Sequence, residues 1–128
     1  MISKVSEGVT ISVETFYQPQ HSNAEVSEFM FAYRVTIENN NKYPIKLLSR
    51  HWDIFDSDGS RREVEGEGVI GVQPSIESGT KYQYISGCNL HTEMGKMHGT
   101  YLMENIYSKK KFIVNIPAFE MIAPEKMN

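Results

Sequence analysis

The feature of this sequence that most limits its fold is a two-residue alternation of apolar and polar side chains. It is clearest in one stretch, whose alternate positions are Phe29, Phe31, Tyr33, Val35 and Ile37. The stretch from Val9 to Tyr17 begins in the same way. Because successive side chains of a strand point to opposite faces, both stretches are predicted to be half-buried β-strands. No window of about 11 or more residues keeps a helical period of about 3.6, so the sequence predicts an all-β chain.

Turn signals divide the chain about every 8 to 15 residues, which suits a β-sandwich of seven or eight antiparallel strands. The residues Asn39-Asn40-Asn41-Lys42 tolerate left-handed backbone, and we expect them to join the strand that ends at Ile37 to the run Tyr43–Phe55 in a hairpin. Within that run the apolar parity changes between Leu47 and Leu48. The change indicates either a β-bulge or burial on both faces, and the pattern does not choose between them.

The rest of the chain shows shorter strand signals separated by turns. Ser57-Asp58-Gly59-Ser60 predicts a tight turn before a short exposed strand at residues 61–64. Further strands are expected at 80–86, 97–104 and 112–116, with a turn at 106–110 between the last two. The apolar segment 119–124 is expected to dock against the sandwich.

The composition is that of one ordinary globular domain, which we assign to residues 1–128. With 13 Lys and Arg against 16 Asp and Glu, the formal net charge is −3, which argues against nucleic acid as a partner. The basic run Lys109–Lys111 is interpreted as a solvated hairpin tip. The single cysteine, Cys88, excludes an intramolecular disulfide. Because the chain has no signal peptide pattern and no apolar stretch of about 18 residues, it is predicted to be cytoplasmic, with no membrane insertion.

Residues 65–74 read EGEGVIGVQP and contain the spacing G-x-G-x-x-G at Gly66, Gly68 and Gly71. Dinucleotide-binding proteins use this spacing around a pyrophosphate, which sits at the N-terminus of a helix that starts at the glycines. Here Val72-Gln73-Pro74 follows, and no helix is predicted. The pattern therefore lacks the structural context that phosphate binding needs.

The charges and the apolar residues of this stretch favour a structural role. Glu65 and Glu67 would repel a phosphate, and no basic residue offsets them before Val72. We interpret the stretch as a connection between strands in which glycines allow positive φ angles, while Val69 and Ile70 pack against the sandwich.

Three other groups of residues could carry chemistry. His91-Thr92-Glu93 resembles the H-x-E element of zinc deaminases, but that mechanism also needs a pair of cysteines and the chain has one. His91, Glu93 and His98 remain candidates for a metal site, although their spacing is no ligand signature. Cys88 lacks a nucleophile motif and is interpreted as a structural thiol.

The third group, Tyr82, Tyr84 and Tyr101, could form a stacking platform for a base or a peptide. Aromatic residues in strands more often serve as core and cross-strand partners.

Several segments together resemble the ApaG family, also called the DUF525 domain. The matching segments are 31–37, 47–52, 64–74, 82–87, 97–103 and 116–119. The resemblance implies an immunoglobulin-like or fibronectin type III-like β-sandwich. It also implies a link to cobalt and magnesium resistance or efflux in bacteria, and partner recognition in eukaryotic F-box and polymerase-interacting proteins that carry the domain. It transfers no catalytic set, and it marks as ligand- or partner-binding candidates Gly66, Gly68, Gly71, Gln73, Pro74, Tyr82, Tyr84, Ser86, Gly87, Gly99 and Tyr101.

These inferences lead to two hypotheses about function. The first is a non-enzymatic β-sandwich that binds a protein partner and needs no cofactor. The alternative is binding of a small ligand or anion, such as a nucleotide or pyrophosphate, at the glycine stretch. The sequence leaves homo-oligomer formation open.

Overall fold

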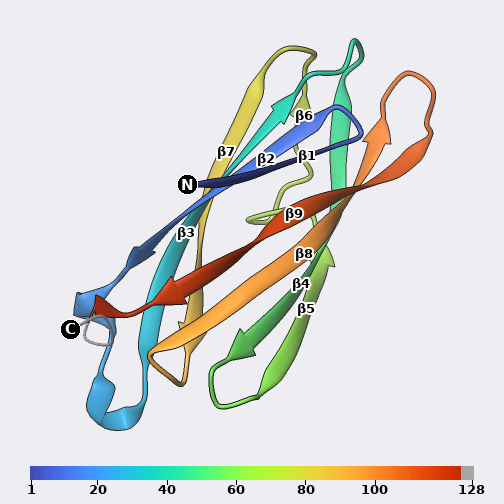
Figure 1. The fold of residues 1–128 in the computed structure, drawn as a ribbon. Helices are drawn as coiled ribbons and strands as arrows, with labels where there is room; N and C mark the ends of the chain where they lie inside the picture. Colours follow the sequence, from blue (N-terminus) through green and yellow to red (C-terminus); the bar gives the residue numbers. More distant parts are fainter. Residues whose placement is uncertain (125–128) are drawn as a thin grey trace.

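A computed structural model describes residues 1–124 as two antiparallel sheets packed face to face (Figure 1). The first sheet has the order β1-β2-β3-β7, made of β1 (Ile2–Ser6), β2 (Val9–Tyr17), β3 (Phe29–Asn39) and β7 (Lys81–Leu90). The second has the order β5-β4-β8-β9, made of β5 (Arg61–Glu67), β4 (Ile45–Asp56), β8 (Met94–Asn105) and β9 (Lys111–Ile122), and β6 (Ser75–Ile76) also pairs with β4. Two 3-10 turns, η1 (Pro19–His21) and η2 (Ala24–Val26), precede β3. The predicted β-sandwich is confirmed, and the described residues form nine strands instead of seven or eight.

The alternating stretches supply the inner face of the first sheet. Strand β3 is buried at every second residue from Phe29 to Asn39, and the first half of β2 shows the same pattern. Between the sheets, Trp52 of β4 lies at the centre of an aromatic cluster. Its ring packs edge-on against Tyr33 of the first sheet and against Tyr101 and Phe119 of the second, with ring centroids 5.5, 6.4 and 5.9 Å away. Edge-to-face contacts of this kind add to the stabilisation that burial of the rings provides. The core therefore lies between the two sheets, as the alternation requires.

The predicted hairpin between β3 and β4 is wrong, because the two strands belong to different sheets. Strand β3 pairs with β2 and β7, whereas β4 pairs with β5, β6 and β8. The turn residues reverse the chain but do not decide which sheet the next strand joins. Asn39 is fully buried at this crossover, and its Nδ2 donates to the carbonyls of Tyr43 and Ile76 at 2.9 and 3.0 Å. These hydrogen bonds tie the end of the first sheet to the start of the second.

The change of parity in β4 is a β-bulge. The register of β4 against β8 shifts between Leu47 and Ser49, and Leu47 is buried while Leu48 is only half-buried. After the bulge, residues 50, 52 and 54 lie on the inner side of the sheet and residues 51, 53 and 55 on the outer side. A single inserted residue thus decides which side chains of β4 reach solvent.

The other strand predictions are confirmed with longer bounds. The turn at 57–60 joins β4 to β5, and the turn at 106–110 joins β8 to β9, with Lys109–Lys111 exposed. The segment expected to dock contains the end of β9 and the residues just after it, and Phe119, Met121 and Ala123 are buried. The edge strand β1 was not predicted, since its residues are mostly exposed. The last four residues of the assigned domain lie outside the described part of the chain.

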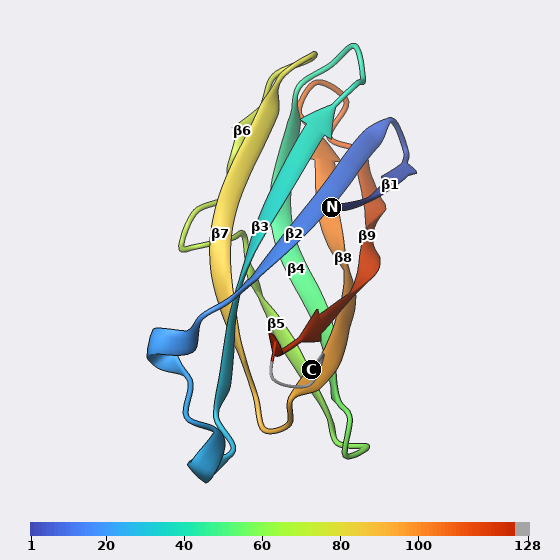
Figure 2. The same ribbon diagram turned by 60° about the vertical axis from the view of Figure 1, so that its left-hand side comes forward.

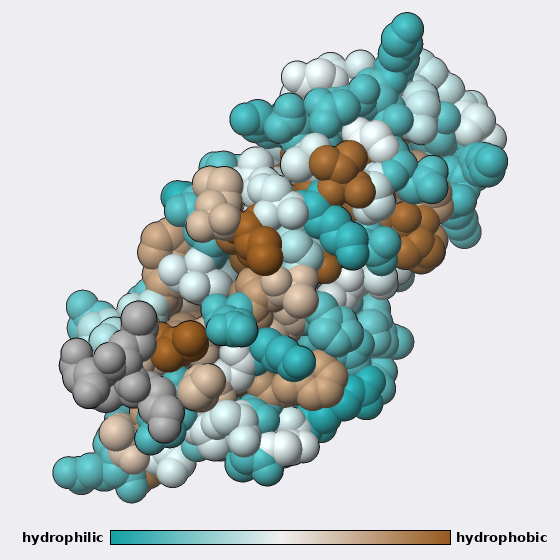
Figure 3. All heavy atoms as spheres, viewed as in Figure 1, coloured by the Kyte–Doolittle hydropathy of each residue, from teal (hydrophilic) through white to brown (hydrophobic). Residues whose placement is uncertain are grey.

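The two sides of the sandwich differ. On one side β1 contacts β9, while β5 and β7 are the edge strands on the other (Figure 2). There Arg62 of β5 reaches across the gap, with its Nη2 donating to the carbonyl of Asn89 in β7. In the view of Figure 3, apolar side chains are scattered among polar ones and form no broad patch. No helix within residues 1–124 is long and apolar enough to cross a membrane.

Candidate functional site

The glycine stretch forms a loop, residues 68–74, that closes the open side of the sandwich. Its centre is a two-residue turn in which the amide of Val69 donates to the carbonyl of Val72 at 2.8 Å and the amide of Val72 donates back at 3.1 Å. The two residues between them, Ile70 and Gly71, have φ angles of +48° and +75°. Positive φ at both central residues is the pattern of a type I′ turn. Figure 2 shows this loop projecting past β7 to the side of the molecule.

Close packing requires one of the glycines and favours a second. A Cβ on Gly68, which has a φ of +56°, would lie 1.8 Å from the carbonyl oxygen of Val72. A Cβ on Gly66 would lie 2.8 Å from the guanidinium of Arg50, a flexible group that would have to shift from its hydrogen bonds to the carbonyls of Glu67 and Gly68. The space around Gly71 is open, so only its positive φ favours glycine. The spacing G-x-G-x-x-G therefore has a structural explanation at each glycine.

The loop is anchored by backbone groups at the bulge of β4. The carbonyl of Leu48 accepts from the amide of Gly68 and from Nε2 of Gln73, both at 2.9 Å. The carbonyl of Pro74 accepts from the amide of Leu47 at 3.0 Å. Gln73 and Pro74, two of the predicted site residues, thus hold the loop in place.

The anion hypothesis finds little support in this geometry. An anion site at a loop needs backbone amides that converge on the ligand. Here the amides of Gly68, Val69 and Val72 already donate within the protein. The Nη1 of Arg50 donates to the carbonyls of Glu67 and Gly68 at 3.0 and 2.9 Å, so this cation is also engaged. No helix follows the glycines within residues 68–80, and anion binding stays a prediction.

The tip of the loop, which we define as Ile70, Gly71 and Val72, is the part that faces solvent. Val69 is 1% exposed and packs in the core as expected, but Ile70 is 59% exposed, so the prediction that it packs is wrong. The reason is the turn itself, which points its central residues away from the sandwich. Val72 is 50% exposed beside it. Neither Ile70 nor Val72 was predicted from the sequence to belong to a site.

Beneath the loop lies the tyrosine pair, which we define as Tyr84 of β7 and Tyr101 of β8. The two hydroxyls are hydrogen-bonded to each other in the core, where Tyr101 is 0% and Tyr84 8% exposed. Burial raises the pKa of both phenols above the ordinary value of 10.0. Neither ring offers a surface on which a base or peptide could stack. Their role in the described structure is that of neutral, paired core residues.

The other predicted candidates lie along the strands. Tyr82 is half-buried at the edge of the core, 6.5 Å from Tyr84 between ring centroids. Ser86 and Gly87 pair with Tyr33 and Ala32 of β3. A Cβ on Gly99 would lie 2.1 Å from the carbonyl oxygen of His51, so this glycine allows β4 and β8 to approach closely.

Cys88 is a buried residue of β7. Burial raises the pKa of its thiol, and the nearest cation, Arg62, offsets this only in part, with its Nη2 3.5 Å from the sulfur. A thiol that is buried and protonated is a weak nucleophile. The structural interpretation of Cys88 agrees with this environment.

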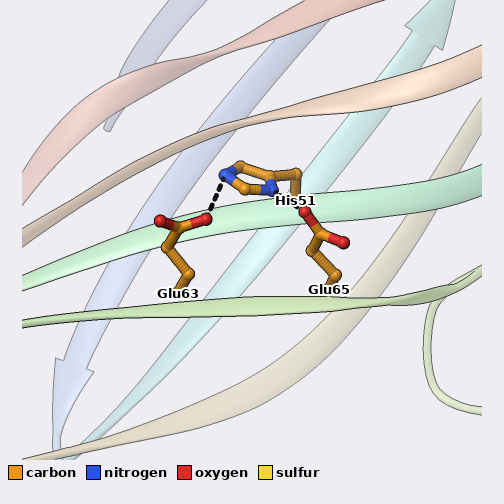
Figure 4. A group of neighbouring side chains, drawn as sticks. All are labelled: His51, Glu63 and Glu65. Atoms are coloured by element: carbon orange, nitrogen blue, oxygen red, sulfur yellow. Dashed lines mark hydrogen bonds and ion pairs between the residues drawn. The ribbon is translucent and has the colours of Figure 1, made fainter.

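The structure brings together a different set of potential metal ligands from the one the sequence suggested. Within residues 1–124, three ligand atoms lie within 4.8 Å of one another only at His51, Glu63 and Glu65 (Figure 4). His98 lies beside this group, with its Nδ1 3.8 Å from Oδ2 of Asp53. His91 and Glu93 lie in the turn between β7 and β8 and do not join it.

The carboxylates around His51 change its acid–base behaviour. Its Nδ1 lies 2.7 Å from Oε1 of Glu65, and its Nε2 lies 3.5 Å from one oxygen each of Asp53 and Glu63. The hydrogen bond to Glu65 and the nearby negative charges raise the pKa of His51 above 6.5. The site was missed because it depends on which residues of β4 and β5 face each other.

Both the sequence and the fold of this chain are similar to those of known proteins. The family model described as the ApaG domain (DUF525) matches residues 19–105. Proteins named ApaG from Brucella suis and Acidithiobacillus ferrooxidans are 42% and 44% identical, with 98% and 90% of this chain and 96% and 90% of theirs covered. The crystal structure of a Bordetella pertussis protein named ApaA superposes with a TM-score of 0.87 at 38% identity, covering 91% of this chain and 94% of that one.

Proposed function

Because this chain belongs to the ApaG domain family, we propose that it is a non-enzymatic β-sandwich module that binds a protein partner. We propose further that the tip of the glycine loop is the binding surface. The observation that carries the proposal is the exposed side chain of Ile70 on a backbone that disfavours it. The proposal extends the partner-recognition role that the resemblance implies to named residues of this chain.

The backbone at Ile70 opposes the residue that occupies it. Left-handed backbone costs a residue with a Cβ roughly 1 to 2 kcal/mol, and for a β-branched residue it is an outlier. The central pair of a type I′ turn is most often Asn-Gly, because both residues tolerate positive φ. Here the pair is Ile-Gly. Since Ile70 is 59% exposed, its packing does little to offset this cost, and strain of this kind is concentrated at functional positions.

The chemistry of the tip suggests the kind of partner. Ile70 and Val72 present two aliphatic side chains on a loop fixed by several hydrogen bonds, so little conformational freedom is lost on binding. Aliphatic anchors of this kind fill apolar pockets at protein interfaces. Glu67 is exposed just before the loop. We expect a partner with an apolar pocket bordered by basic or polar residues.

The family link to cobalt and magnesium leads to a narrower form of the proposal, in which the partner takes part in the handling of these ions. This form has the resemblance as its only support. It predicts that cells carrying Ile70→Asn and cells lacking the protein respond alike to added cobalt, whereas cells carrying Val26→Asn resemble the wild type. Val26 is a suitable control because it is also 59% exposed, but lies in η2.

The proposal is tested by recovering partners from lysate with tagged wild-type protein and the same two variants. Proteins bound through the tip are expected to be recovered with the wild type and Val26→Asn and to be lost with Ile70→Asn. Because asparagine suits the turn, loss of binding would not be explained by loss of the fold, which amide NMR spectra check. Recovery of the same proteins in the same amounts with Ile70→Asn would contradict the proposal.

A further inference from the structure

Five side chains that can bind metal ions gather on the outer face of the second sheet. His51 and Asp53 lie two residues apart on β4 and therefore on the same side of the sheet. Across the β4–β5 ladder they pair with Glu65 and Glu63, and across the β4–β8 ladder Asp53 pairs with His98. Cross-strand partners lie close enough for their side chains to interact. The register alone thus collects two imidazoles and three carboxylates in one place.

The orientation of the His51 ring gives its two nitrogens different neighbours. Oε1 of Glu65 lies 2.7 Å from Nδ1, the distance of a charge-assisted hydrogen bond. With the proton held on Nδ1, the lone pair of Nε2 points away from Glu65. Figure 4 shows Glu65 at one ring nitrogen and Glu63 at the other. In metal sites a carboxylate commonly fixes a histidine in this way, through the nitrogen that does not bind the metal.

Two carboxylate oxygens face the free nitrogen. Oδ2 of Asp53 and Oε2 of Glu63 both lie 3.5 Å from Nε2 of His51. In a tetrahedral site with metal–ligand distances of about 2.0 to 2.1 Å, neighbouring ligand atoms lie roughly 3.3 Å apart. Asp53 does not belong to the set of ligand atoms that all lie within 4.8 Å of one another, so Oδ2 of Asp53 and Oε2 of Glu63 lie further apart than one ion requires. The exposed side chain of Glu63 must therefore turn toward Asp53 to complete the site. Nδ1 of His98 lies 3.8 Å from Oδ2 of Asp53 and outside the set of close ligand atoms.

Arg61 holds the opposite oxygens of the same two carboxylates. Its Nη2 donates to Oδ1 of Asp53 and to Oε1 of Glu63, the latter at 2.8 Å. Each carboxylate thus gives one oxygen to Arg61 and turns the other toward His51. Ligating carboxylates in metal sites are commonly hydrogen-bonded through their second oxygen. With His51 neutral, the three carboxylates and one guanidinium of this group leave two negative charges, which suits a divalent cation.

The surface around the group has room for an ion and water. A hollow of about 420 Å³ is lined in part by His51, Asp53 and His98. A second hollow of about 520 Å³, on the Glu65 side, also includes His51 in its lining. The imidazole therefore stands between two open depressions.

We propose that Nε2 of His51, Oδ2 of Asp53 and Oε2 of Glu63 bind a first-row divalent metal ion such as Zn²⁺, with Glu65 and Arg61 positioning these ligands. A mixed nitrogen and oxygen set of this kind favours Zn²⁺ over Mg²⁺, which prefers six oxygen ligands in an octahedron. The site lies on the outer face of the second sheet, and metal binding there would be a function additional to partner binding by the loop tip.

The site is tested by titrating the tag-free chain with Zn²⁺. Binding is monitored by calorimetry and by NMR of the histidine ring nitrogens. We expect saturable binding of one ion, with the largest change at Nε2 of His51. His51→Gln and Asp53→Asn should each weaken binding at least about tenfold, since even loss of a supporting residue costs about 10- to 100-fold. Mg²⁺ should leave the His51 ring resonances unchanged at the same concentrations.

The matched control is His91→Gln, which removes an exposed histidine outside the group and should change the affinity less than about twofold. If Asp53→Asn alters the amide NMR spectrum broadly, Glu63→Gln on the exposed edge strand replaces it. The proposal is overturned if Zn²⁺ gives no saturable binding, if Nδ1 of His51 is the nitrogen that responds, or if His91→Gln weakens binding as much as His51→Gln. Because these experiments use the purified chain alone, their outcome is independent of whether a protein partner exists.

Discussion

The tip of the glycine loop and the tyrosine pair differ in how well their residues suit their positions, although Ile70 and Tyr84 line the same small hollow of about 130 Å³. In the pair, Tyr84 and Tyr101 are buried in strands, which suits aromatic residues, and their hydroxyls satisfy each other. At the tip, Ile70 is exposed and has a positive φ, which disfavours a β-branched residue. At the tyrosine pair the residue types suit their buried strand positions, so these residues stabilise the fold. At Ile70 the residue type does not suit its exposed, left-handed backbone position, so a role other than stability is the better explanation.

The largest effect is expected at the base of the loop. Gly68→Ala places a Cβ against the carbonyl oxygen of Val72 on left-handed backbone, so the free energy of unfolding should fall by roughly 3 kcal/mol. Gly71→Ala meets no neighbouring atom and should cost only about 1 kcal/mol. Urea unfolding of both variants measures the difference. Equal losses would show that packing against Val72 does not hold the loop.

Alkaline pH probes the tyrosine pair through its raised pKa values. Below a pH of about 10 both phenols stay protonated in the folded and unfolded chains, so the pair adds no pH dependence. Above it the unfolded chain releases these protons first, because burial keeps the pKa of Tyr84 and Tyr101 higher in the folded state. Between pH 9 and 11 the wild type should therefore lose roughly 2 to 3 kcal/mol more stability than Tyr84→Phe/Tyr101→Phe. Parallel losses in the two proteins would mean that the hydroxyls are not buried.

Single and double phenylalanine substitutions test whether the hydroxyls act as a pair. Tyr84→Phe leaves the hydroxyl of Tyr101 buried without its partner, which should cost about 1 to 3 kcal/mol at neutral pH. Tyr84→Phe/Tyr101→Phe removes both polar groups and should cost less than the sum of the two single changes. Urea unfolding of the three variants forms a double-mutant cycle. Additive losses would contradict direct coupling.

The alternation of apolar residues predicted the sandwich well, because strand periodicity is a local property that core burial enforces. The pairing of strands was harder, since it depends on contacts distant in sequence. Residues Asn39–Lys42 signalled a reversal, yet the choice of sheet is associated with the buried hydrogen bonds of Asn39. The predicted link between β3 and β4 failed for this reason.

The His51 group could have been found from the sequence with one further step. The turn at Asp58 and Gly59 was predicted, and residues at equal distances from Asp58 pair across β4 and β5, such as His51 with Glu65. Counting outward from the turn would have placed the carboxylates beside the histidine. The approach of His98 would still have been missed, because the register of β8 depends on the bulge in β4.

Two turns show why the exposure of Ile70 was not anticipated. In the turn at residues 57–60, Asp58 and Gly59 are turn formers, and Oδ1 of Asp58 accepts from the amide of Ser60 at 2.9 Å. Val69-Ile70-Gly71-Val72 was interpreted as a connection in which the glycines take the positive φ angles and the aliphatic residues pack, so Ile70 was expected to be buried. The conflict between residue and backbone appears only in the folded structure.

The smallest expected change is also the most direct test of the account, which holds that Ile70 is retained against the preference of the fold. The measurement is the free energy of unfolding of Ile70→Asn in urea, with Val26→Asn as the control for an equally exposed apolar residue. Asparagine suits positive φ, so Ile70→Asn should be about 0.5 to 1 kcal/mol more stable than the wild type, while Val26→Asn should stay within about 0.5 kcal/mol of it. A loss of stability in Ile70→Asn would show that Ile70 serves the fold, and would contradict the central claim.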